Sequence, residues 1–170
     1  MVLKDECFMT GYRKQLISWM FVMSQNIFPK LFKNHEPWRT YRAELLTSPE
    51  NTIGKYLGLF LEKYGLELIS KVERHPYHTI TRYGPKVEDE IALHYLCLSN
   101  GKRSLYMYGA ILLAILPEYY NYYLRSFRLG KQGNPFHHYD YKKLLNVPID
   151  DFRQAIFSTR EFKLVNRPLI

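Results

Sequence analysis

The chain has 170 residues, of which 46% are hydrophobic and 24% charged, and its formal net charge is +8. This length suits one domain with a hydrophobic core and is short for two, so we expect a single domain over residues 1–170. The charge indicates an anionic partner, such as a phospholipid surface, a nucleic acid or an acidic ligand. Because 16% of the residues are aromatic and many tyrosines lie beside Lys or Arg, the composition favours an anionic membrane surface.

Three features narrow the cellular location. The only cysteines are Cys7 and Cys97, so the sequence predicts no disulfide framework and a reducing compartment. The N-terminal segment lacks an apolar core followed by a cleavage site, so no secretory signal is expected. The longest apolar run, Leu105–Leu116, is shorter than the roughly twenty residues that span a bilayer as a helix. We therefore expect a cytoplasmic protein that associates peripherally with a membrane.

The sequence lacks the commoner motifs of nucleotide, hydrolase and zinc-protease sites. It contains no glycine-rich phosphate loop, no nucleophile elbow, no paired C-x-x-C and no H-E-x-x-H. No recognisable nucleic-acid docking motif accompanies the positive charge, so nucleic acid is disfavoured as a partner.

Proline and glycine separate a series of helical patterns, and two-residue alternation is rare. The sequence therefore predicts an all-α fold, a single compact domain of about seven to eight helices. The predicted helices cover residues 11–28, 37–46, 49–64, 66–73, 76–82, 86–99, 105–128 and 149–157.

Helix boundaries follow from capping residues. Ser48 is predicted to cap the third helix and Ser104 the seventh, which we expect to be kinked or broken at Pro117. Gly130 and Gly133 are expected to mark a loop. The short segment 141–145 is predicted to be helical with Asp140 as its cap, and Pro148 and Gly65 are expected to open the last helix and close the third.

The first predicted helix has an apolar face rich in Trp, Phe and Met. Leu16, Trp19, Met20, Met23 and Ile27 recur at spacings of three and four. Such a face either packs in the core or contacts a membrane as an amphipathic helix.

One helical segment, residues 90–101, is apolar on nearly every side yet carries Glu90 and His94. A helix that is apolar all round is normally buried, and a buried carboxylate needs a cation, a donor or a metal. His94 lies four residues after Glu90 on the same side of the helix, while His75 and His78 precede it at a spacing of three. One carboxylate and up to three imidazoles could therefore converge.

Structural interpretations of the same residues stay open. Glu90 could form a buried ion pair, with Arg74, Arg82 or Arg103 as its partner. His94 could pair with Glu90 within one helical turn and have no further role.

The spacing of His78 and Glu90, with eleven residues between them, resembles the coenzyme Q (ubiquinone) biosynthesis protein four family. That family carries an H-D-x-x-H motif, eleven residues and then Glu, proposed as a metal site. Aligning His78 and Glu90 with the second His and the Glu places Arg74 at the first His and His75 at the Asp. Two of the four motif positions therefore match.

Later segments add to this resemblance. The sequences YYLRSFRLGKQG and LLNVPIDDFRQAI are similar to the family's later segments, where a terminal helix contains an Arg. The resemblance covers roughly residues 10–157, and its most specific part lies between residues 74 and 101.

The resemblance implies an all-helical domain with a metal near an apolar pocket, linked to a membrane-associated biosynthetic complex. It implies oxidative decarboxylation of a prenylated benzoate-type precursor, in which the ring loses a carboxyl and gains a hydroxyl. His78 and Glu90 would be the catalytic and metal-binding core, with His75 and His94 as replacement ligands. Iron or zinc would suit such ligands, and both remain open.

The residues and the resemblance are consistent with two functions. The leading hypothesis is a membrane-peripheral protein of quinone biosynthesis that acts on or holds a prenylated aromatic precursor, together with other biosynthetic proteins. Its enzymatic form would be a metal-dependent oxidative decarboxylase, with Arg74 gripping the substrate carboxylate. The alternative is a non-catalytic isoprenoid- or lipid-binding scaffold without metal, in which Arg74 pairs with Glu90. The run Leu105–Leu116 would line the channel for the apolar tail.

Overall fold

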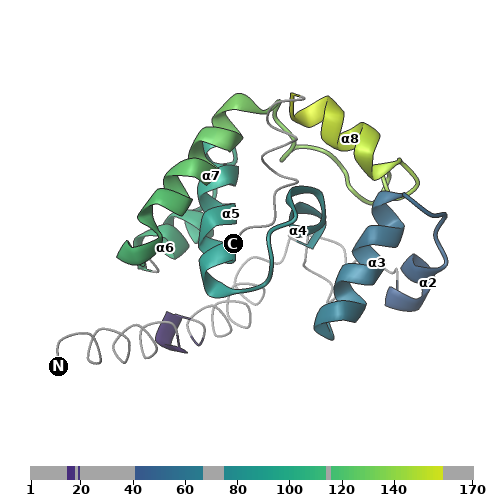
Figure 1. Cartoon of the computed structure of the whole chain (residues 1–170), viewed down its shortest axis with the longest axis horizontal. Helices are drawn as coiled ribbons and strands as arrows, with labels where there is room; N and C mark the ends of the chain where they lie inside the picture. The colour runs from purple at the N-terminus through teal and green to yellow at the C-terminus, as the bar shows by residue number, and fades with distance from the viewer. Residues whose placement is uncertain (1–14, 18, 20–40, 67–74, 114–115, 159–170) are drawn as a thin grey trace.

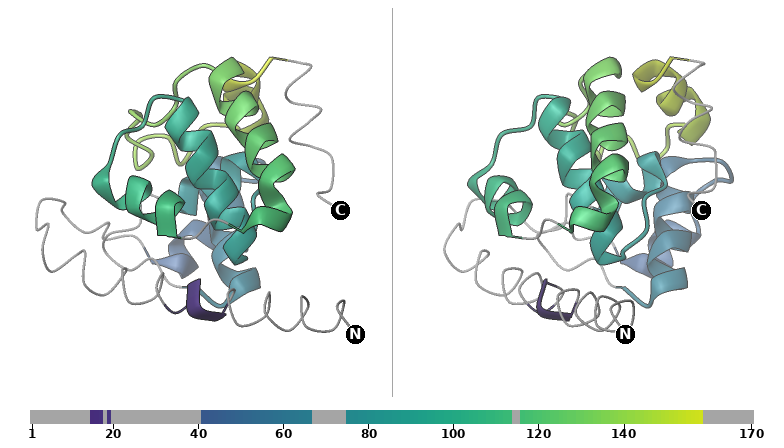
Figure 2. Two further views of the ribbon diagram at one scale, coloured as in Figure 1. Left: turned by 90° about the vertical axis from the view of Figure 1, so that its left-hand side faces the viewer. Right: turned by 60° about the vertical axis from the view of Figure 1, so that its left-hand side comes forward.

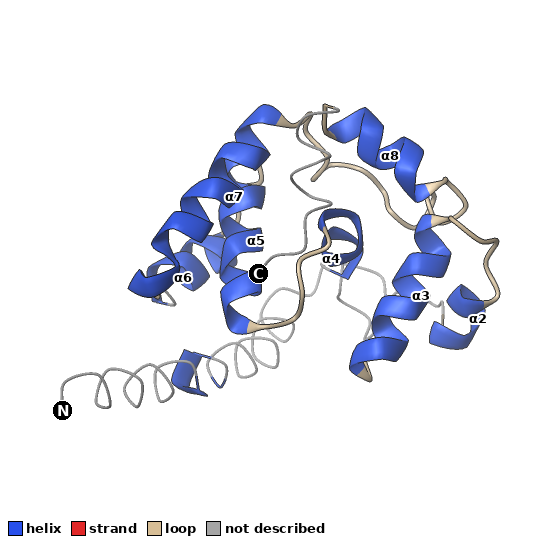
Figure 3. Ribbon diagram, viewed as in Figure 1, coloured by secondary structure: helices blue, strands red, loops and turns tan. Residues whose placement is uncertain are grey.

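Helices make up most of the described part of the chain, joined by turns and by a long loop between α7 and α8 (Figures 1 and 3). The computed structural model describes residues 15–17, 19, 41–66, 75–113 and 116–158. These residues form seven α-helices, one 3-10 helix and no strand, which confirms the predicted all-α class. The elements are α2 (Arg42–Leu46), α3 (Ile53–Tyr64), α4 (His75–Thr81), α5 (Val87–Ser99), α6 (Leu105–Leu113), η1 (Pro117–Tyr119), α7 (Tyr120–Gln132) and α8 (Ile149–Ile156).

The helices α5 and α7 form the centre of the core and lie side by side (Figure 2). Ile91 and Leu96 of α5 and Tyr123 of α7 are buried between them. The prediction that Gly130 lies in a loop was wrong, because α7 continues to Gln132. A Cβ at Gly130 would collide with the backbone oxygen of Leu96, so glycine here permits the close approach of two helices.

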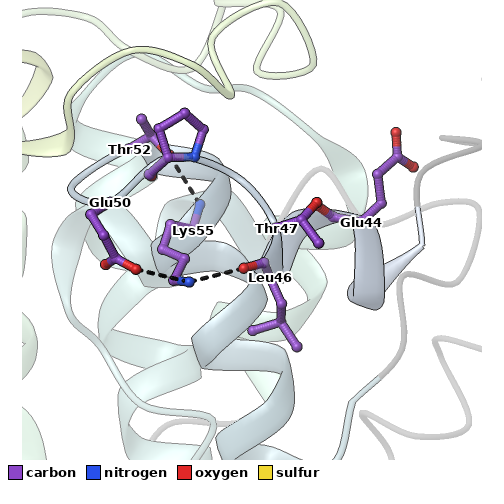
Figure 4. A network of polar contacts seen from close by, with 7 residues as sticks. Glu44, Leu46, Thr47, Glu50, Thr52 and Lys55 are labelled. Carbon is purple, nitrogen blue, oxygen red and sulfur yellow. Dashed lines mark hydrogen bonds and ion pairs between the residues drawn. The ribbon is translucent and has the colours of Figure 1, made fainter.

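The α3 helix starts later than predicted. Its N-cap is Thr52, whose hydroxyl accepts a hydrogen bond from the backbone N–H of Lys55 at 3.3 Å. Ser48, the predicted cap, lies against Gly54, where an added Cβ would be 2.8 Å from its hydroxyl oxygen. Lys55 also pairs with Glu50 at 2.9 Å, which ties the preceding turn to the helix (Figure 4).

The end of α3 confirms the prediction, because Gly65 closes it in the left-handed conformation at φ 63°. The α3 helix packs on α2 through a small cluster built on Leu45, Leu57 and Leu61.

The long apolar helix predicted over 105–128 is divided as expected near Pro117. The α6 helix ends at Leu113, the 3-10 helix η1 starts at Pro117, and α7 follows. The predicted cap is confirmed, because the Ser104 hydroxyl accepts from the backbone N–H of Met107 at 3.2 Å. The break lets α7 turn back along α5.

The segment before α8 differs from the prediction, whereas the start of α8 agrees with it. The α8 helix begins after Pro148 as predicted, whereas 141–145 forms turns rather than a helix, with Asp140 accepting from the Lys142 N–H at 3.2 Å. Of the helix predicted over 11–28, only residues 15–17 and 19 are described, and they are helical. Residues 37–40 and nearly all of the predicted helix 66–73 lie outside the described ranges. Within the described ranges, none of the helices has both the length and the apolar character needed to cross a bilayer.

Candidate functional site

His78 and Glu90 meet between the helices α4 and α5. The Nε2 atom of His78 lies 3.1 Å from Oε1 of Glu90. The His78 side chain is 2% exposed and that of Glu90 is 19% exposed, so the contact is almost closed to solvent. The eleven residues between them include the end of α4, a turn and the first residues of α5. The sequence prediction that these two side chains approach each other is confirmed.

The orientation of the His78 ring is fixed on two further sides. Its Nδ1 atom lies 3.2 Å from the backbone oxygen of Tyr83, and the ring stacks on Phe60 with centroids 5.5 Å apart. Because a carbonyl oxygen only accepts, Nδ1 carries a proton in this arrangement. Nε2 is therefore the ring nitrogen that faces Glu90.

The turn that presents the Tyr83 carbonyl is itself anchored in the core. The Tyr83 hydroxyl forms a 2.7 Å hydrogen bond with Ser126 of α7. Burial raises the pKa of Tyr83 to about 12, so its side chain remains a neutral phenol at physiological pH. Arg82 adopts φ 60° and so reverses the chain directly before Tyr83. The turn therefore holds the Tyr83 carbonyl against His78.

The first turn of α5 has a second anchor. Asp89 accepts a 2.7 Å hydrogen bond from the Tyr122 hydroxyl of α7. Burial, and then this hydrogen bond, raise the pKa of Tyr122 well above its usual range. Glu88, Asp89 and Glu90 all lie in this first turn, where the positive end of the helix dipole stabilises carboxylates.

Arg153 of α8 holds the helix that carries His78. Its Nε donates to the backbone oxygen of Ile80 at 2.9 Å and its Nη2 to that of Thr79 at 2.8 Å. The residue is 1% exposed, and Nη1 reaches Asp150 at 3.3 Å. Burial, and then the charge of Arg82, lower the pKa of Arg153 to about 10, so it remains protonated at neutral pH.

The role of Arg153 was missed from the sequence, although one signal pointed to it. Arg153 follows Ile149 by four residues and precedes Ile156 by three, so it lies on the apolar face of the last helix. A cation on a buried face requires acceptors. Which acceptors these are depends on the packing of α8 against α4.

Two other predicted site residues, His75 and His94, lie on the same two helices as the pair. The His75 ring is half-buried, with its centroid 6.5 Å from that of His78. His94 is buried one turn after Glu90. Arg74 lies outside the described residues. In the described part of the chain, no group of three or more His, Cys, Asp or Glu side chains could hold a metal ion. The metal roles of His75 and His94, and the substrate role of Arg74, stay predictions.

Comparisons with known proteins give a likeness in fold. No protein-family model matches the chain, and no curated protein matches it either. The fold is similar to a crystal structure from Nostoc punctiforme PCC 73102, of a protein provisionally named a ubiquinone biosynthesis protein, with a TM-score of 0.60 and 14% identity. The match covers 91% of this chain and 82% of that one. At this identity the likeness shows the fold alone. It agrees with the fold that the family resemblance implied.

Proposed function

We propose that this protein works in the biosynthesis of a ubiquinone-like quinone, where it holds a prenylated aromatic precursor. His78 and Glu90 would form the polar end of its binding site. The observation that carries the proposal is the contact between these two residues across the eleven-residue spacing of the family motif. The fold likeness supports the same pathway, because the provisional name of the similar protein refers to ubiquinone biosynthesis.

The pair has the chemistry to bind a ring hydroxyl or carboxyl. His78 presents Nε2, and Glu90 presents a carboxylate beside it, so the two side chains can donate and accept at one place. His78 is buried while Glu90 is partly exposed. A ligand would therefore approach from the Glu90 side and displace little of the packing around the imidazole.

Metal-dependent oxidative decarboxylation is a second candidate, favoured by the geometry of the His78 contacts. Ligands of zinc or iron lie about 2 Å from the ion, so two neighbouring ligands can be near 3 Å apart, as Nε2 and Oε1 are. Metal-binding histidines also commonly donate their other ring N–H to a carbonyl, as Nδ1 does here. However, catalytic sites take three protein ligands, and the described residues supply no such group. We therefore assign no step of a reaction to a metal.

The protein would work at a membrane surface, since its precursor carries an apolar chain. The charge of +8 and the many tyrosines beside Lys or Arg support attraction to anionic lipid. Other enzymes of the pathway would be its partners there.

Complementation tests this proposal. In a strain that lacks its own family member and makes no ubiquinone, the native chain should restore the quinone, whereas His78→Ala and Glu90→Gln should not at equal protein levels. His138→Ala and Glu62→Gln are matched controls, because both side chains are exposed and lie outside the pair. Equal rescue by all variants would reject His78 and Glu90 as site residues.

A second readout makes the test independent of the host pathway. Mass spectrometry of lipids co-purified with each variant should find a prenylated aromatic with the native chain and the controls. It should be depleted in the two site variants. A native protein that enriches no such lipid would contradict the holding function.

A further inference from the structure

The outward face of α6 is apolar and open to solvent. Leu105 and Leu112 are 78% and 75% exposed, and Tyr108 is 39% exposed. A Cβ added at Gly109 would meet nothing within 4 Å. These four residues follow one another at intervals of three, one and three, so they form one face of the helix.

The opposite face of α6 already packs on the core. Met107 is buried and Ile111 packs against the core cluster, so this helix is attached to the domain by its inward side. No residue of α6 is charged. A surface helix of a water-soluble domain normally turns polar residues outward, and an exposed apolar face of this kind indicates an interaction site.

The charged residues of the segment 91–117, which contains α6, are of one sign. From Ile91 to Pro117 the sequence contains no Asp or Glu, while Lys102 and Arg103 lie directly before α6. Arg103 is exposed, and its guanidinium donates to the backbone oxygens of Leu98 at 2.6 Å and of Lys102 at 2.9 Å. Its charge is therefore held at the start of the helix.

Arg103 does not stabilise α6, because its guanidinium bonds a carbonyl in the last turn of α5 and lies before the N-terminus of α6. The N-terminus of a helix carries a partial positive charge, so cations beside it add to the potential instead of neutralising it. The combined field favours an external anion. Apolar side chains next to such a field fit the interface of an anionic bilayer, where acyl chains and phosphates lie side by side.

We propose that the α6 face, defined as Leu105, Tyr108, Gly109 and Leu112, inserts into the interface of an anionic phospholipid bilayer. Arg103 would lie at the headgroup phosphates, whereas the ammonium of Lys102 lies over the Tyr77 ring, 4.5 Å from its centroid. A second copy of the chain is a poorer occupant, because two such faces would bring their cations together in a protein that already carries a charge of +8. The inference deepens the membrane side of the proposed function and does not depend on the His78–Glu90 pair.

Vesicle flotation with the purified full chain tests this inference. The native protein should float with phosphatidylcholine vesicles containing one quarter phosphatidylglycerol and remain largely unbound with pure phosphatidylcholine. Raising the salt concentration should reduce the bound fraction, because screening weakens the attraction to phosphate. Leu105→Ser with Leu112→Ser should weaken partitioning at least tenfold, and separately Arg103→Gln should weaken it about fivefold.

The control is Leu59→Ser, which removes an exposed leucine of α3 and should leave partitioning unchanged. Circular dichroism would verify that each variant keeps its helical content. Equal flotation of native protein and α6 variants would overturn the inference, as would loss of flotation only after Leu16→Ser with Trp19→Ser. Dimers in light scattering that the α6 variants dissociate, without an effect on flotation, would assign the face to a second copy. Since no precursor is added, failure here leaves the complementation result standing.

Discussion

The His78 region buries polar groups, whereas the α6 helix exposes apolar side chains to solvent. Around His78, charged and polar groups are buried, and nearby structure provides partners: Tyr83 and Glu90 for the imidazole, and carbonyls of α4 for Arg153. On α6, the apolar side chains Leu105, Tyr108 and Leu112 are exposed, and the helix itself carries no charged residue.

Each arrangement has a cost in the isolated domain. Buried charges lose hydration and need well-placed partners, and exposed leucines keep contact with water. Hydrogen bonds within the fold compensate the lost hydration of the buried groups, which indicates a rigid site that is formed before a ligand binds. The contact of the α6 leucines with water is not removed within the described structure, which indicates that this surface binds a partner outside the domain.

The largest expected effect separates a glycine at the α5–α7 crossing from a glycine on the open face of α6. Gly130→Ala should lower the free energy of unfolding by about 3 kcal/mol or more, because its Cβ would overlap the Leu96 backbone at the α5–α7 crossing. Gly109→Ala, on the open face of α6, should instead stabilise by about 0.5–1 kcal/mol, because alanine favours a helix. Urea unfolding measures both. Similar values for the two would show that the regions do not differ in packing.

The next effect concerns the charge buried against α4. Arg153→Lys should cost about 2 kcal/mol, since an ammonium cannot reproduce the forked donation to the Thr79 and Ile80 carbonyls. The control Arg128→Lys, at an exposed position of α7, should stay within about 0.5 kcal/mol of the native value. Equal stability of the two variants would remove Arg153 as the support of the His78 helix.

A smaller effect should appear when the anchor of the turn is altered. Tyr83→Phe should cost about 1 kcal/mol at pH 7 through the lost Ser126 hydrogen bond. In the native protein the folded pKa of Tyr83 lies near 12, above the value of 10 for the unfolded chain. Its contribution is therefore complete below pH 10 and lost as the pH rises through 12. The variant should lose less stability over that interval, and an unchanged alkaline slope would contradict this assignment.

The smallest effect on stability belongs to the α6 face. Leu112→Gln should change the free energy of unfolding by less than about 0.5 kcal/mol, because the side chain is exposed in the folded protein. Leu116→Ala, at a fully buried leucine only four residues on, should cost about 2–5 kcal/mol. A large loss in the first variant would mean that Leu112 is covered in solution.

Local signals predicted much of the architecture. Gly65 and Pro117 act through their own backbone geometry, so the end of α3 and the break after α6 could be predicted from neighbouring residues. Gly130 was placed wrongly because the same residue type also serves close helix contacts. The reason for that glycine lies in Leu96, thirty-four residues earlier in the chain, and no local pattern contains it.

In the site, too, the features set by neighbouring residues could be predicted, and those set by distant contacts could not. Glu90 could be identified from the sequence because a carboxylate on an otherwise apolar, buried helix needs a compensating group. The motif spacing then indicated His78 as that group. The Tyr83 carbonyl and the carbonyls that accept from Arg153 could not be inferred, because backbone acceptors carry no sequence signature. The α3 cap shows a milder case, since Ser48 and Thr52 are both good caps by residue type, and the helix begins after Thr52.

The central claim is that the His78–Glu90 pair is the polar end of a precursor site, and imidazole NMR tests it directly. With the ring nitrogens labelled, 3-farnesyl-4-hydroxybenzoate would be added to the native protein and the resonances of His78 followed, with exposed His138 as the internal reference. The account predicts a saturable shift of the His78 Nε2 signal that is lost in Glu90→Gln, while the His138 signal stays constant. A His78 signal that remains unchanged at saturating ligand, or that moves together with His138, would contradict it.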